Sequence, residues 1–159
     1  MFYRREKLCP WDPDSRVCKL KKELKQLKGS LDPDLHLTDR ITKYHIRSGA
    51  TLRSYVQLHA VLALCDMALH REYIAFLPWD QRQPAGPIDG RTLPPPPTEE
   101  KTYWKDNASS CFRAARQFND LARACFDDGV LVETPVVGFA MFYVVQIGAL
   151  VHRLGYDKC

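Results

Sequence analysis

The chain has 159 residues, of which 45% are hydrophobic and 26% charged, and it carries a formal net charge of +4. This composition is typical of a globular protein long enough to bury one core, and it excludes a disordered or low-complexity chain. The positive charge lies in the N-terminal third, because residues 1–53 hold 13 Lys and Arg against 7 Asp and Glu. If the chain contacts an acidic partner, this third is the part suited to it.

The six cysteines are interpreted as reduced thiols of an intracellular protein. No secretory signal is visible, because MFYRREKL turns polar before an apolar segment develops. No pair of cysteines has C-x-x-C spacing, so the sequence supports neither a zinc ribbon nor a thioredoxin-like redox site.

After an N-terminal segment, residues 1–14, the sequence predicts a basic amphipathic helix over residues 15–31. Asp14 or Ser15 can cap its start, and Gly29 marks its end. Its leucines recur at helical spacing: Leu20, Leu24, Leu27 and Leu31. Three lysines share another face: Lys21, Lys25 and Lys28. We interpret the lysines as a solvated face rather than a nucleic-acid site, because no aromatic residues alternate with them to stack on bases.

A weaker helical segment is expected from about Thr38, and a strong helix over residues 50–70. The strong helix has apolar residues on one face, namely Tyr55, Leu58, Leu62, Cys65 and Leu69. Such a pattern is typical of the central helix of a core. His59 and Asp66 lie inside this run, and a hydrogen-bonded core histidine and a partly exposed aspartate are favoured over a functional pair.

Residues 78–100 are expected to form a long proline-rich loop, because seven of the eleven prolines fall between Pro78 and Pro97. A stiff connector is the favoured interpretation, and an SH3-type ligand is the alternative.

The next predicted helix begins near residues 98–104, runs to about Phe126 and ends at Asp127-Asp128-Gly129. Its seam alternates steps of four and three without a fault: Trp104, Ala108, Cys111, Ala115, Phe118, Ala122 and Cys125. Small residues, three alanines and two cysteines, occupy five of these seven positions and permit close approach to a neighbouring helix.

Residues 134–154 form the most apolar stretch, in which Gln146 is the only polar side chain between Pro135 and Val151. Thr134 and Pro135 are a good N-cap and first helical residue. We interpret the stretch as a buried core helix that another helix crosses closely at Gly138 and Gly148. A membrane span is the alternative, although the run is at the lower limit of length.

No motif predicts catalysis. The chain has no G-x-S-x-G, no P-loop, no G-x-G-x-x-G after a strand and no H-E-x-x-H. His59 and Cys65 are six residues apart, which places them on different helix faces, so they do not form a nucleophile–base pair. No catalytic, metal-binding or cofactor-binding residue is predicted.

Five short phrases, in order, carry a resemblance to a known family: PWDPDS, LHREYIAFLPW, GPIDG, the YW to NDL segment at residues 103–121, and LVETPVVGFA. Together they resemble the fungal-specific transcription factor domain, the middle homology region of zinc binuclear-cluster factors, and most closely its xylanolytic-activator type. The matching motif residues look structural rather than catalytic: His70, Arg71, Glu72, Tyr73, Pro78, Trp104, Phe112, Glu133, Thr134, Pro135 and Gly138.

The resemblance implies an all-α regulatory domain of four or five helices in a nuclear protein that controls RNA polymerase II transcription. Its expected partners are transcription-related proteins or a second copy, together with a small-molecule inducer. The six-cysteine zinc cluster of the family is not in this sequence, so zinc and DNA contact are expected only through an absent domain. Residues 15–77, 78–100 and 101–159 would form one partial domain of a larger factor, whose uncovered helix faces predict marginal stability or self-association. A membrane-associated helical protein is the alternative.

Overall fold

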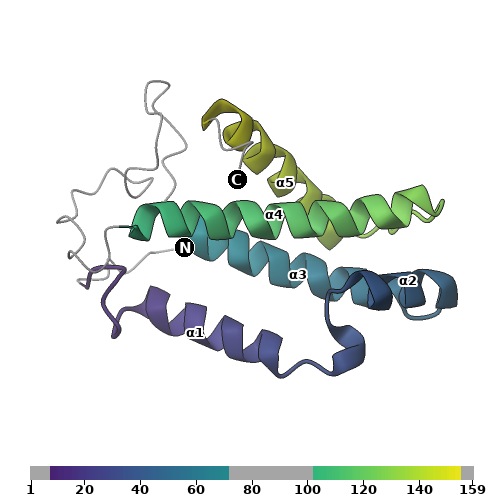
Figure 1. Cartoon of the computed structure of the whole chain (residues 1–159), viewed down its shortest axis with the longest axis horizontal. Helices are drawn as coiled ribbons and strands as arrows, with labels where there is room; N and C mark the ends of the chain where they lie inside the picture. The colour runs from purple at the N-terminus through teal and green to yellow at the C-terminus, as the bar shows by residue number, and fades with distance from the viewer. Residues whose placement is uncertain (1–7, 72–101, 155–159) are drawn as a thin grey trace.

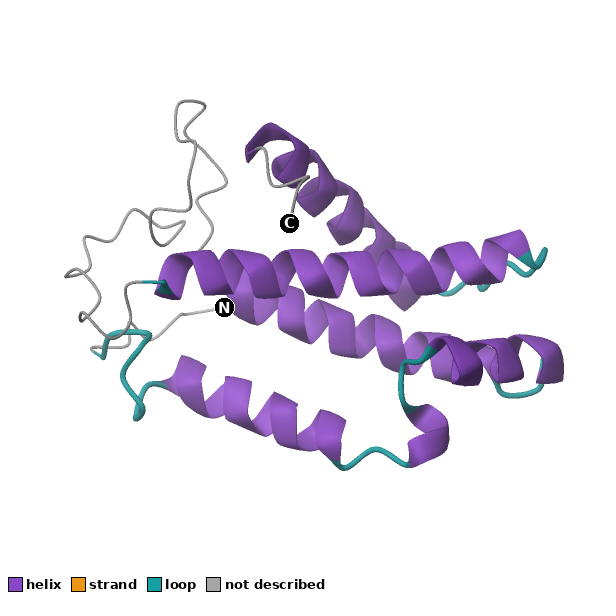
Figure 2. Ribbon diagram, in the orientation of Figure 1, coloured by secondary structure: helices purple, strands orange, loops and turns teal. Residues whose placement is uncertain are grey.

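The structure is a computed structural model that describes residues 8–71 and 102–154. Over these residues the chain forms five α-helices, one short 3₁₀-helix and no strand, which confirms the all-α prediction (Figure 2). The elements in chain order are α1 (Arg16–Gly29), η1 (Pro33–Leu35), α2 (Asp39–Ser48), α3 (Leu52–Arg71), α4 (Tyr103–Asp127) and α5 (Pro135–Leu154). The predicted proline-rich loop lies outside the described residues.

Three helices begin at capping side chains whose residue types already indicate a helix start in the sequence. The hydroxyl of Ser15 accepts a hydrogen bond from the Cys18 amide at 3.1 Å, and Thr38 does the same for Ile41 at 3.3 Å. Thr134 accepts from the Val137 amide at 3.2 Å, with Pro135 as the first residue of α5, as predicted. Each cap satisfies an amide that would otherwise lack an intrahelical acceptor.

The helices α3 and α4 run in opposite directions through the middle of the molecule (Figure 1). On one side α1 lies along α3, and on the other side α5 runs obliquely across both central helices. The short α2 packs at the beginning of α3. The central pair is thus covered from two sides by helices of very different character, one basic and one apolar.

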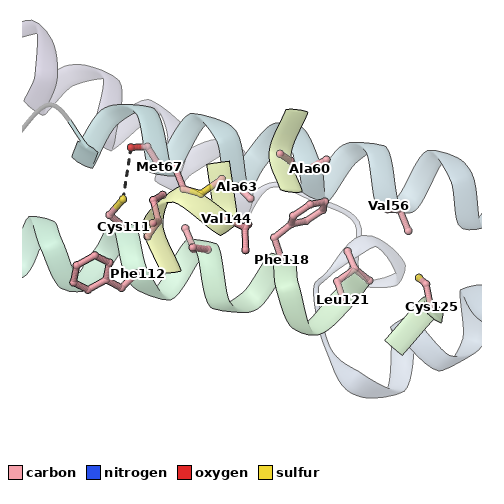
Figure 3. Close-up of a cluster of buried hydrophobic side chains, with 14 of the residues drawn as sticks. Val56, Ala60, Ala63, Met67, Cys111, Phe112, Phe118, Leu121, Cys125 and Val144 are labelled. Carbon is pink, nitrogen blue, oxygen red and sulfur yellow. Dashed lines mark hydrogen bonds between the residues drawn. The ribbon is translucent and has the colours of Figure 1, made fainter. Parts of the chain in front are cut away.

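The core lies where α3, α4 and α5 meet (Figure 3). Phe118 and Met67 are almost completely buried there, at 1% and 0% exposure. Alanines fill the positions between the large side chains, so the two central helices can approach closely. The predicted seam of α4 is confirmed, since five of its seven residues are buried: Ala108, Cys111, Ala115, Phe118 and Cys125.

The prediction for the basic helix is wrong for part of each face. Leu24 and Leu31 are half-buried and Lys25 is exposed, as predicted. Leu20 and Leu27, expected in the same apolar seam, are exposed. Lys21 and Lys28, expected in solvent, are half-buried and turn toward the central helices. The reason is that polar acceptors lie opposite α1, Asp66 on α3 and Asn107 on α4. They accept hydrogen bonds from Lys28 and Lys21, respectively, and the lysines therefore turn inward.

The central position of α3 is confirmed, but its buried stripe differs from the predicted one. Cys65 and Val61 are exposed, whereas Val56, Ala60 and Met67 are buried. Both faces are apolar in sequence, and the positions of α4 and α5 select the one that is buried.

The prediction that α5 is a buried core helix is confirmed for one side of the helix and wrong for the other. Only one side of it packs on the core, through Ala140, Val144 and Ile147. The expected close crossings at Gly138 and Gly148 are absent from the described part of the chain, because a Cβ added at either glycine would meet no heavy atom of it within 4 Å. Over the described residues no helix lies beyond α5 to cover its other side.

Candidate functional site

The outer face of α5, defined here by Phe139, Phe142 and Val145, is the most prominent apolar surface of the described chain. These side chains are 53%, 56% and 67% exposed. The ring of Tyr143 lies 5.0 Å from that of Phe139 and 6.3 Å from that of Phe142, so the aromatic residues form one cluster. No charged residue occurs between Pro135 and Val151.

Two more exposed apolar side chains precede this helix. Phe126, at the end of α4, is 72% exposed, and Leu131, in the connection to α5, is 70% exposed. Large apolar side chains clustered on one helix face, as on the outer face of α5, mark an interaction site rather than an ordinary solvated face.

Among the residues whose side chains are described, no helix is both long and apolar enough to cross a membrane.

A second feature is a polar clamp that holds the η1 segment against α2 and α3. Three successive backbone carbonyls each receive a side-chain donor. His45 Nε2 lies 2.9 Å from the Asp34 oxygen, His59 Nε2 lies 3.0 Å from the Leu35 oxygen, and the Tyr55 hydroxyl donates to the His36 oxygen at 3.2 Å.

The rings of the clamp also pack on one another. His45 stacks on Tyr55 at 4.2 Å between ring centroids, and His59 meets Tyr55 edge-on at 4.5 Å. Burial lowers the pKa of His59 and raises the pKa of Tyr55, so both groups favour their neutral forms. His59 is therefore the hydrogen-bonded core histidine that the sequence favoured. Asp66 is half-buried and pairs with Lys28, which also agrees with the partly exposed aspartate expected there.

A third feature is a polar junction where α1, α3 and α4 meet. The amide oxygen of Asn107 accepts from Lys21 Nζ at 2.5 Å and lies 2.8 Å from His70 Nδ1. The Asn107 amide nitrogen donates to the Tyr103 carbonyl at 2.7 Å. Burial lowers the pKa of His70. The junction joins three helices and so acts as a structural contact.

The family-motif residues do not gather into one site. Trp104 is half-buried and packs edge-on against Trp11, Phe112 is in the core, and Thr134 caps α5. Glu133, Pro135 and Gly138 are exposed at the start of α5. The helix position of Arg71 is described but its side chain is not, and Glu72, Tyr73 and Pro78 lie outside the described residues.

His59 and Cys65 are turned apart on α3, since His59 is buried and Cys65 exposed. Within residues 8–71 and 102–154, no three His, Cys, Asp or Glu side chains come close enough together to hold a metal ion. The five described cysteines are present as thiols, and burial raises the pKa of Cys125.

Sequence reasoning missed the outer face of α5 because it placed Phe139, Phe142 and Val145 in the core. The stretch is apolar around its whole circumference, and such a pattern carries no periodic signal to separate a buried side from an exposed one. The only available signal was the absence of a further predicted helix that could cover both sides.

The fold and this surface define an all-α protein with an exposed aromatic helix face. Comparison of the chain with protein-family models, with curated proteins and with solved structures found no match.

Proposed function

We propose that this chain is a non-enzymatic regulatory module of transcription that acts through protein–protein contact, and that its outer α5 face pairs with a second copy of the chain. The observation that carries the contact is the exposure of Phe139, Phe142 and Val145 on one uncharged helix face. Burying such side chains against a partner removes apolar surface from water, at about 25 cal/mol per Å².

The transcriptional setting rests on the sequence alone. The five phrases quoted above resemble the middle homology region of fungal zinc-cluster factors, and this region lies in nuclear regulators. In this proposal the chain supplies regulation and association, while zinc and DNA contact belong to a zinc-cluster domain outside this sequence.

A second copy is the occupant that the outer face of α5 fits. The face has no charge, so two copies meet without like-charge repulsion or a buried unpaired ion. At steps of three along the helix the residues decrease in size, from Phe139 and Phe142 through Val145 to Gly148. In an antiparallel pair centred between Phe142 and Val145, Phe139 of one copy lies opposite Gly148 of the other. Among the described residues no heavy atom lies within 4 Å of a Cβ built at Gly148, so this space can receive the ring.

Sedimentation velocity over a range of protein concentrations tests the pairing. The wild-type chain is expected to dimerise, and Phe142→Glu is expected to be monomeric, because it would bury two carboxylates in the apolar contact. Leu27→Glu is the matched control, since Leu27 is 53% exposed on α1, on the opposite side of the central helices. A monomeric wild type would overturn the pairing, as would equal dissociation of both variants. Co-flotation of the chain with lipid vesicles would favour the membrane alternative.

A tethering experiment tests the transcriptional role separately. The full chain is fused to an unrelated DNA-binding domain upstream of a reporter gene. The fusion is expected to change reporter output, Phe142→Glu to abolish the change, and Leu27→Glu to retain it. Reporter output equal to that of the DNA-binding domain alone would contradict the proposed role in transcription. It would not affect the proposed dimerisation, which sedimentation tests separately.

A further inference from the structure

A cavity of about 200 Å³ lies between α1, the η1 segment, α3 and α4, on the side of the central helices opposite the outer face of α5. The floor of the cavity is apolar and comes from both central helices: Leu62 and Ala63 from α3, and Ala114 and Phe118 from α4. Its mouth includes the exposed side chains of His36, Leu37 and Gln117.

The volume suits a small organic molecule. An apolar cavity of about 150 Å³ is enough to hold a benzene ring. A molecule with a single ring therefore fits the space between the floor and the mouth, and its apolar surface would lie against the ring of Phe118 and the side chain of Leu62.

His59 supplies one specific polar group in the wall. The residue is only 5% exposed, and it is one of the residues that line the cavity. Its Nε2 lies 3.0 Å from the Leu35 carbonyl oxygen. A carbonyl oxygen only accepts, so Nε2 must carry the hydrogen, and in the neutral ring Nδ1 is then an acceptor with a free lone pair.

Over the described residues the hydrogen bond to Leu35 is the one that His59 makes, and every fully buried side-chain nitrogen or oxygen there has a partner. Nδ1 is therefore not fully enclosed by protein atoms, and the cavity that His59 lines is the space from which a ligand would reach it. Burial lowers the pKa of His59, which keeps the ring neutral and Nδ1 available.

The remaining polar groups favour an uncharged ligand. Lys28 pairs with Asp66 at the edge of the cavity, so neither side chain leaves a charge uncompensated. His36 Nε2 lies 3.0 Å from the Leu31 carbonyl oxygen. A charged ligand would lose its hydration without gaining an unpaired counter-ion.

We propose that this cavity binds a small neutral molecule with one apolar ring and one hydroxyl group, of the phenol class, whose hydroxyl donates a hydrogen bond to His59 Nδ1. The ring lies on the floor formed by α3 and α4. This binding is independent of the pairing at α5, because no residue of α5 lines the cavity.

Titration of the full chain with phenol, and with toluene as the isosteric probe that lacks a donor, tests the proposal by calorimetry. Phenol is expected to bind about tenfold more tightly than toluene, because one net hydrogen bond is at stake. His59→Phe keeps an aromatic ring but removes the acceptor, and it should abolish this preference. The matched control His36→Phe makes the same change at the mouth and should retain it. Ala114→Leu fills the floor and should weaken the binding of both probes.

Nitrogen NMR of the wild-type histidines keeps the test decisive if a cavity variant fails to fold. Phenol is expected to shift the Nδ1 resonance of His59 and leave its Nε2 resonance nearly unchanged, whereas toluene should not shift Nδ1. Failure of phenol to bind, equal affinity for the two probes, or an unshifted Nδ1 resonance on saturation with phenol would each overturn the proposal.

Discussion

At the scale of single residues, the most informative groups are two histidines with different tasks, His59, which is buried, and His70, which is half-buried. His59 holds the η1 segment through the Leu35 carbonyl, and His70 joins α3 to α4 through Asn107. Burial lowers the pKa of both rings. Their neutral forms are therefore part of the folded structure, and protonation must work against folding.

These two histidines predict loss of stability in mild acid. Below about pH 6.5, the ordinary histidine pKa, the unfolded chain binds protons that the folded chain resists. The free energy of unfolding should therefore fall as the pH drops from about 6.5 toward the lowered folded pKa values, and it should be level in this respect above about pH 6.5. Urea unfolding at a series of pH values measures the slope.

The double variant His59→Gln, His70→Gln serves as the control, since glutamine does not titrate. It is expected to be less stable at neutral pH but to show a smaller fall in mild acid. A slope equal to that of the wild type would assign the acid sensitivity to other groups.

At the scale of single elements, glycine has opposite roles at the two ends of the α4–α5 connection. Gly129 ends α4 with a φ of +72°, a conformation that favours glycine. Gly138 lies within α5, and a Cβ there would meet no heavy atom within 4 Å. The same substitution at the two positions should therefore change stability in opposite directions.

Gly138→Ala is expected to raise the free energy of unfolding by about 0.5–1 kcal/mol, because alanine loses less backbone entropy in a helix. Gly129→Ala is expected to lower it by about 1 kcal/mol, because a Cβ is strained at this φ. Both values come from urea unfolding at a single protein concentration, below the range in which the chain associates. If Gly138→Ala lowered the free energy of unfolding instead, the result would support the close helix crossing that the sequence had suggested.

At the scale of the whole molecule, α3, α4 and α5 share one core, while the other side of α5 is apolar and exposed to solvent. Phe118 and Phe139 show the contrast, since one is 1% exposed and the other 53%. The contribution of a phenylalanine to the free energy of unfolding therefore depends on its place in the bundle and not on its residue type.

Phe118→Ala is expected to destabilise the monomer by about 3–5 kcal/mol, because it removes a buried ring and leaves a cavity between α3, α4 and α5. Phe139→Ala is the matched control and should cost much less, since its ring already contacts water. Thermal unfolding monitored by circular dichroism compares them. Similar losses for the two variants would mean that the outer face of α5 is covered within the single chain.

The sequence by itself determined the helices and most of their boundaries. Caps at Ser15, Thr38 and Thr134, the turn at Gly129 and the unbroken seam of α4 are local signals, because each depends on contacts within one or two turns of the chain. The task of His59 as a bonded core histidine was likewise favoured by its place inside an apolar run, although its acceptor at Leu35 was not foreseen.

Only the tertiary structure decided which face of each helix is buried. The leucines and lysines of α1 both repeat at helical spacing, and the polar acceptors Asn107 and Asp66 drew the lysines inward. In α5 every face is apolar, so its sequence pattern does not predict which face is buried. The positions of α3 and α4 decide this, and Phe142 and Val145 are exposed to solvent. The cavity beside His59 is decided in the same way, because it arises where four elements fail to fill the space between them.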